Sequence, residues 1–190
     1  MDKIGAIIKL MFTDPKKNVL EFGFIPGQRV VDLGSGAGHY SLALSHALGE
    51  AGKVVAIDID KPLLSKLKNE SMELGQTNVD VLDGNIEKLG GVRLRDAYAD
   101  GVVFSNILFQ LNSIPTALEE AKRVLKPGGK ACVVEWTDLT MLTGKKDYLQ
   151  GKAIPEVDTK KFFEKAGFVF ERSFNAGEKN YGLIFKKPLQ

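Results

Sequence analysis

Short apolar runs alternate with helical patterns along most of this chain. Such alternation is typical of a parallel β-sheet covered by helices, because the buried strands read as continuous apolar segments and the crossover helices repeat near every 3.6 residues. The pattern predicts seven strands, at residues 29–33, 53–57, 79–82, 101–104, 130–136, 168–174 and 181–187.

The segments between these strands carry signals for helix starts and stops. The expected helices are 40–48 before Gly49, a second from the cap Asp60 to Gly75, a third from Ser113 to Pro127-Gly128-Gly129, and a fourth from the cap Asp158 to about Gly167. Residues 137–157 show no clear period and are expected to form a loop, and Met1 to Phe12 is expected to be a short amphipathic helix.

The last two strands are joined by the polar segment 175–180, which predicts an antiparallel hairpin. An ordinary dinucleotide fold would continue with another crossover helix instead. The predicted fold class is therefore α/β, a doubly wound and mostly parallel seven-stranded sheet with a C-terminal antiparallel hairpin. We expect one domain over 1–190, with a helical segment at 1–25 and an α/β core at 26–190.

Composition narrows this picture only slightly. A length of 190 residues fits a single domain with a full core, and a formal charge of +2 is too small to imply a strong overall field. The single cysteine, Cys132, lies in an apolar run and has no disulfide partner in the chain, so a cytoplasmic location is expected. No apolar run approaches the roughly 20 residues of a membrane span, and no residue cluster has metal-ligand spacing.

Candidate chemistry concentrates in the turn after the first predicted strand. Asp32 to Gly38 reads Asp-x-Gly-x-Gly-x-Gly and leads into a helical pattern, as expected of a ligand-binding turn at a helix N-terminus. A dinucleotide-binding Gly-x-Gly-x-x-Gly starting at Gly34 would need glycine where His39 stands. A phosphate-binding loop is also excluded, because no Lys-Ser or Lys-Thr follows the glycines.

A carboxylate, Asp58, stands at the end of the second predicted strand. Together with Asp32 to Gly38 it resembles the first two motifs of the class I S-adenosylmethionine-dependent methyltransferases. The order of elements from Pro26 to Pro188 is similar to that family. The run Leu125-Lys126-Pro127-Gly128-Gly129 and the later Ala166-Gly167-Phe168 most resemble its UbiE-like, or type 11, branch.

The resemblance implies S-adenosyl-L-methionine as cofactor and assigns roles to particular residues. Asp32 and the glycine backbone would hold the methionine end, Asp58 the ribose diol, Ile59 a face of the adenine, and Asn85 with Ile86 its edge. The full predicted cofactor set is Asp32, Gly34, Ser35, Gly36, Gly38, Asp58, Ile59, Gly84, Asn85, Ile86, Ser105 and Asn106. Each carboxylate or amide also has a structural alternative, since Asp32 and Asn85 could satisfy turn N–H groups and Asp58 could start a helix.

The acceptor side is expected beside the end of the fourth strand, at 105–109, with help from Glu135, Trp136 and Asp138. Methyl transfer needs alignment more than it needs an acid, so no catalytic residue is assigned. If the acceptor must lose a proton, His39 is the candidate base, and its alternative is a solvent-facing residue at a helix start. The aromatic residues that could floor an acceptor pocket or simply belong to the core are Phe109, Trp136, Tyr148 and Phe163.

The predicted function is methyl transfer from S-adenosylmethionine to a small molecule, such as an aromatic or isoprenoid-like acceptor. The base-modifying signature Asn-Pro-Pro-Tyr is absent from the chain, although ten Lys and Arg against six acids from Met141 onward keep an RNA acceptor open. A protein acceptor and a non-catalytic, cofactor-binding partner protein are further alternatives. An NAD-dependent oxidoreductase is disfavoured by the glycine spacing, and the sequence leaves the oligomeric state open.

Overall fold

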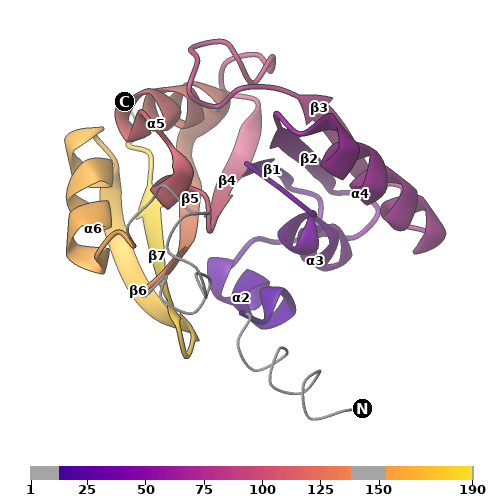
Figure 1. The fold of residues 1–190 in the computed structure, drawn as a ribbon, viewed down its shortest axis with the longest axis horizontal. Helices are drawn as coiled ribbons and strands as arrows, with labels where there is room; N and C mark the ends of the chain where they lie inside the picture. The colour runs from indigo at the N-terminus through magenta and orange to yellow at the C-terminus, as the bar shows by residue number, and fades with distance from the viewer. Residues whose placement is uncertain (1–12, 138–152, 190) are drawn as a thin grey trace, which may run out of the picture.

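The computed structural model describes residues 13–137 and 153–189. Its helices and strands follow the predicted alternation (Figure 1). In chain order they are α2 (Pro15–Phe22), β1 (Arg29–Leu33), α3 (His39–Leu48), β2 (Lys53–Asp58), α4 (Lys61–Glu73), β3 (Val79–Asp83), β4 (Ala99–Ser105), the 3-10 turn η1 (Leu108–Gln110), α5 (Ile114–Val124), β5 (Leu125–Trp136), α6 (Glu156–Lys165), β6 (Val169–Gly177) and β7 (Asn180–Lys186).

The strands form one seven-stranded sheet in the order β3-β2-β1-β4-β5-β7-β6. The first five strands are parallel, and β7 is antiparallel to both β5 and β6. This arrangement confirms the predicted fold class. The strand order reverses between β1 and β4, and ligands in such sheets bind outside the carboxyl ends of the strands at that point.

Alternate residues of the central strands pack on opposite faces of the sheet, which gives a three-layer structure. Val31 and Leu33 belong to the core cluster shared with α5 and α6, whereas Val30 belongs to the cluster shared with α2 and α3. The helix α4 packs through Leu64 and Leu67 on Ala56 of β2. In Figure 1, α3 and α4 lie beside β1–β3, and α6 lies beside β7. Both faces of the sheet are therefore covered by helices, as parallel strands require.

Side chains cap three of the helices at their N-termini. Asp14, Asp60 and Ser113 accept hydrogen bonds from the first turns of α2, α4 and α5, and a proline follows each cap. The prediction that Asp158 caps the last helix is wrong. That helix, α6, begins at Glu156 with the extended Pro155 as its N-cap, and Asp158 lies in the first turn, where a negative charge interacts favourably with the helix dipole.

A second boundary also differs from expectation. The run Pro127-Gly128-Gly129 does not end a helix, because α5 stops at Val124 and β5 begins at Leu125, which already pairs with Ala99. The register between β4 and β5 then shifts before Gly101 pairs with Lys130. The proline and glycines therefore interrupt the strand pairing as an irregularity inside β5, which a sequence pattern cannot distinguish from a helix stop.

Some predictions fall on residues outside the described part of the chain. These are the amphipathic helix at Met1–Phe12, most of the loop at 137–157, the acceptor-side candidate Asp138 and the aromatic candidate Tyr148. Of the helical segment expected at 1–25, the structure describes α2, which packs Val19 and Phe22 against the sheet.

Candidate functional site

The glycine-rich turn joins β1 to α3 at the carboxyl edge of the sheet. Gly34, Gly36 and Gly38 all have positive φ, at 75°, 52° and 81°, which explains why glycine occupies these positions. The turn is pinned to the neighbouring strand, because the backbone N–H groups of Gly34 and Ser35 both donate to the carbonyl of Ile57 at 2.8 and 2.9 Å.

The three glycines face different surroundings. A Cβ on Gly34 would lie 2.5 Å from Cγ1 of Ile107, and a Cβ on Gly38 would lie 2.2 Å from Cδ1 of Leu67. A Cβ on Gly36 would meet no atom within 4 Å. Gly34 and Gly38 therefore allow close packing within the protein, whereas Gly36 presents bare backbone to open space.

Asp32 lies beneath this turn and is completely buried. Its Oδ2 accepts a 2.6 Å hydrogen bond from Ser41 Oγ, while its Oδ1 and the buried Ser35 Oγ have no partner among the described residues. Burial raises the pKa of Asp32 to about 6, with a further upward contribution from the charge of Asp58, although the Ser41 hydrogen bond lowers it. Two unpaired polar atoms below the glycine turn are suited to binding a polar, cationic ligand group.

Asp58 ends β2 next to the same turn. Its Oδ2 accepts from the N–H of Gly36 at 2.8 Å, and its Oδ1 accepts from the N–H of Asp60 at 2.9 Å. Each carboxylate oxygen can accept a second hydrogen bond, so both oxygens could still bind the hydroxyls of a diol. The following residue, Ile59, is 70% exposed, which leaves a large apolar side chain beside Asp58 for an apolar ligand face.

The third strand end brings Gly84, Asn85 and Ile86 to this edge. Asn85 is exposed and its Oδ1 accepts from the N–H of Glu87 at 2.8 Å, which is the local turn that its structural alternative predicts. That oxygen retains one further acceptor site. The Ile86 side chain is buried in the core, so Asn85 is the member of this pair that presents a side chain to solvent.

Ser105 and Asn106 lie at the end of β4, beside β1. Asn106 adopts a φ of 54°, and its N–H donates to the carbonyl of Val134 at 2.8 Å. Its Oδ1 accepts a 2.9 Å hydrogen bond from Nδ2 of Asn180 in β7. Asparagine tolerates this left-handed conformation better than most residues, and the contact with β7 holds it there.

The other candidates differ in their exposure. His39 is exposed at the first position of α3. Phe109 and Trp136 form a small cluster with Ala153 and Ile154 at the carboxyl edge of the sheet. Phe163 instead belongs to the core, where its ring stacks on Phe185.

Sequence reasoning missed several residues that support this edge. Ser41 was not recognised as the partner of Asp32, and no signal could have linked Asn180 to Asn106 across 74 positions. Glu120 in α5 is buried and accepts from the N–H groups of Gly90 and Val92, behind the loop that carries Asn85. Burial alone would raise the pKa of Glu120, but its hydrogen bonds, first among them that from Arg123, hold the pKa below its usual value.

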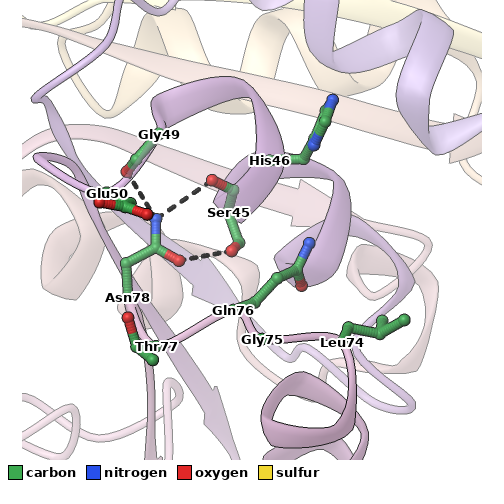
Figure 2. A pocket seen from close by; sticks show the side chains of 9 residues that line it. All are labelled: Ser45, His46, Gly49, Glu50, Leu74, Gly75, Gln76, Thr77 and Asn78. Carbon is green, nitrogen blue, oxygen red and sulfur yellow. Dashed lines mark hydrogen bonds between the residues drawn. The ribbon is translucent and has the colours of Figure 1, made fainter.

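A polar cavity lies at the opposite, amino-terminal edge of the sheet and is separate from these residues. It has a volume of about 250 Å³ and is lined by the end of α3 and by residues 74–78 (Figure 2). Asn78 crosses it, accepting from Ser45 Oγ and donating to the carbonyls of Ser45 and Gly49. These contacts connect the end of α3 to the start of β3, so Asn78 has a structural role here.

The described residues include neither a metal-ligand cluster nor a helix suited to span a membrane. Within 13–137 and 153–189, no group of three or more His, Cys, Asp or Glu side chains is arranged to hold a metal ion. None of the helices in this part of the chain has the length and apolar character needed to cross a bilayer.

Comparison with known proteins identifies the family. A family model described as a methyltransferase domain matches residues 25–170, which is more than half of the chain. The chain belongs to this methyltransferase family. The predicted family resemblance is therefore confirmed, and the match includes the glycine-rich turn and the ends of β2, β3 and β4.

Individual relatives agree with this assignment. Demethylmenaquinone methyltransferase of Oceanobacillus iheyensis is 32% identical over 126 residues, which are 64% of this chain and 50% of that protein. The ubiquinone/menaquinone biosynthesis C-methyltransferase UbiE of Vibrio cholerae is 34% identical over 116 residues, 60% of this chain and 44% of that protein. The methyltransferase domain thus spans about half the length of these curated relatives.

Solved structures show the same fold. A SAM-dependent methyltransferase from Aquifex aeolicus superposes with a TM-score of 0.79 at 28% identity and covers 98% of this chain and 99% of its own. The [4+2]-cyclase SpnF superposes with a TM-score of 0.75 at 18% identity, covering 92% and 81%. The second similarity concerns the fold alone, and it illustrates that this fold also carries other chemistry.

Proposed function

We propose that this methyltransferase domain transfers the methyl group of S-adenosylmethionine to a small, quinone-type acceptor. The observation that carries the proposal is the pair of unpartnered polar atoms, Asp32 Oδ1 and Ser35 Oγ, beneath a glycine turn whose Gly36 faces open space. Similarity to demethylmenaquinone methyltransferase supports the acceptor class.

The residues at the edge fit the cofactor in charge and polarity. We assign the methionine end to Asp32 and the glycine backbone, because a buried carboxylate with a free oxygen suits an ammonium group. Asp58 is assigned to the ribose diol, Ile59 to the adenine face, and Asn85 to the adenine edge. Each charge-assisted hydrogen bond of this kind contributes about 1.5–3 kcal/mol when well formed.

The cofactor supplies a methyl group that is already activated on a sulfonium. The protein therefore has to align the acceptor with this methyl group and does not have to activate it. Orientation of two reactants can lower a barrier by about 7–11 kcal/mol. In our proposal Ser105 and Asn106 border the cofactor, and the turn that follows them faces the acceptor. His39, exposed at the start of α3, is the candidate to take a proton from an acceptor that must lose one.

Calorimetry tests the cofactor site first. Wild type should bind S-adenosylmethionine and S-adenosylhomocysteine but not NAD. Asp58→Ala should weaken the binding of S-adenosylhomocysteine about 100-fold, equivalent to ~2.7 kcal/mol, by removing the diol contact. Asp80→Ala is the matched control, because Asp80 pairs with Lys53 at the far end of the sheet. Failure of wild type to bind either sulfur compound would refute the proposal.

Transfer of radiolabelled methyl from S-adenosylmethionine then tests the acceptor class. Demethylmenaquinol should be labelled, whereas bulk RNA and protein should not. Labelling of RNA that weakens steeply with added salt would replace the quinone-type acceptor with a nucleic acid. Tight cofactor binding without labelling of any acceptor would favour a non-catalytic, cofactor-binding partner protein.

A further inference from the structure

A buried carboxylate, Glu135, lies at the carboxyl end of β5, the strand that pairs with β4 and β7. Its exposed fraction is 0%. Oε2 accepts a 2.9 Å hydrogen bond from the N–H of Leu108, and Oε1 accepts one of 2.9 Å from the N–H of Trp136. One carboxylate therefore connects the end of β5 to the turn that follows β4.

Backbone groups, rather than a cation, compensate this carboxylate. The N–H groups of Ile107 and Phe109 act on it in addition to those of Leu108 and Trp136, and none of the ion pairs found within 13–137 and 153–189 involves it. Burial raises the pKa of Glu135 to about 7, although these N–H groups lower it. The buried Glu120 differs, because it pairs with Arg123 at 2.7 Å.

The turn held by Glu135 consists of residues 106–109. It lies at the carboxyl edge of the sheet and contacts residues on both its β1 side and its β7 side. Toward β1, Ile107 fills the space that a Cβ on Gly34 would need. Toward β7, Asn106 accepts from Asn180. On the remaining side, Phe109 packs with Trp136. Displacing this turn would therefore disturb the glycine-rich turn and the aromatic cluster together.

We propose that Glu135 is a positioning residue that fixes the 106–109 turn as the common wall of the cofactor and acceptor sites. This inference rests on the proposed function. Glu135 is completely buried and both of its oxygens already accept backbone hydrogen bonds, unlike Asp32 with its unpaired Oδ1, so Glu135 acts through the backbone of the turn and not by contact with the acceptor. The hydrogen bonds from Leu108 and Trp136 arrive on different oxygens, so the carboxylate joins the turn to the end of β5 through two separate acceptors.

The single tryptophan of the chain provides a direct measurement, because Trp136 is 7% exposed and packs on Phe109 of the turn. Glu135→Gln keeps the size of the side chain but directs an amide NH₂ at backbone N–H donors. We expect acrylamide quenching of Trp136 to rise at least two-fold, and the Kd of S-adenosylhomocysteine to rise about ten-fold. Glu171→Gln, on the outer strand β6, is the matched control and should leave both values unchanged.

A second variant distinguishes a change in the wall of the cofactor site from a general loss of stability. Ile107→Ala removes the contact with Gly34 without altering Glu135. It should therefore weaken the binding of S-adenosylhomocysteine to a similar extent, while the acrylamide quenching of Trp136 stays near that of wild type. Unchanged quenching and a Kd within two-fold of wild type in Glu135→Gln would overturn the proposal. If wild type binds no S-adenosylhomocysteine, the proposed function fails, and the quenching comparison still tests whether Glu135 holds the turn.

Discussion

The two halves of the sheet build their carboxyl edges with contacts of different range. In the cofactor half, formed by β1–β3 and their loops, Asp32 binds Ser41 nine positions away and Asp58 binds Gly36 22 positions away. In the acceptor half, formed by β4–β7, Glu135 binds Leu108 across 27 positions and Asn106 binds Asn180 across 74. The cofactor edge is thus built within neighbouring β–α units, whereas the acceptor edge depends on the whole sheet.

This difference has a consequence for substitution. A change in the cofactor half should affect ligand binding directly, because Asp32, Ser35 and Asp58 are the residues proposed to bind the cofactor. A change in the acceptor half should act indirectly, through the position of the 106–109 turn. Substitutions in the two halves should therefore differ in how they change cofactor binding.

Gly36→Val should abolish measurable cofactor binding. Valine at a φ of 52° is strained by about 1–3 kcal/mol, and its side chain would enter the open space in front of the turn. We expect calorimetry to show a loss of S-adenosylhomocysteine affinity of about 100-fold or more, ~2.7 kcal/mol.

Gly27→Val is the matched control for backbone strain. Gly27 has a φ of 88°, and a Cβ there would also meet no atom within 4 Å, but it lies in the turn before β1. The two variants should lose similar thermal stability, and only Gly36→Val should lose binding. Equal loss of binding in both would mean that the open space at Gly36 is not part of the cofactor site.

The ease of sequence-based prediction follows the same division. Local sequence patterns indicate the glycine turn, Asp58 and the strand order, so the fold class and the family could be predicted. The partners Ser41, Asn180 and Glu120 could not, because hydroxyl, amide and carboxylate side chains have no periodicity that reveals a distant contact. The run Pro127-Gly128-Gly129 and the start of α6 were misplaced for another reason: strand pairing and an extended Pro155 overrode local stop and cap signals.

Cofactor affinity should rise with pH through the titration of Asp32. The pKa of this carboxyl is raised to about 6, chiefly by burial, and its ionised form is the one that would bind an ammonium group. The ionised fraction grows from roughly one tenth at pH 5 to roughly nine tenths at pH 7, so S-adenosylhomocysteine affinity should increase about ten-fold over that range. Calorimetry in buffers of different ionisation enthalpy should also detect proton release on binding below pH 7.

The folding stability of the free protein should change with pH in the opposite direction to the cofactor affinity. Because the folded-state pKa of Asp32 exceeds its ordinary value of 3.8, the folded state binds more protons than the unfolded state between about pH 4 and 6. The stability contributed by this group is therefore present at low pH and is lost as the pH rises through 6. In Asp32→Asn both trends should flatten, and a variant that retained the pH-dependent affinity would assign it to another group.

The smallest effect is expected from the long-range contact in the acceptor half. Asn180→Ala removes the 2.9 Å hydrogen bond to Asn106 Oδ1 and should lower the free energy of unfolding by about 1 kcal/mol in urea denaturation. Asn106→Gly should cost less than Asn106→Ala, because glycine adopts a φ of 54° without strain. In a double-mutant cycle, Asn106→Gly and Asn180→Ala should show a coupling of about 0.5–1.5 kcal/mol. Additive effects would mean that β7 does not hold the turn, and that the acceptor edge, like the cofactor edge, is built from neighbouring units alone.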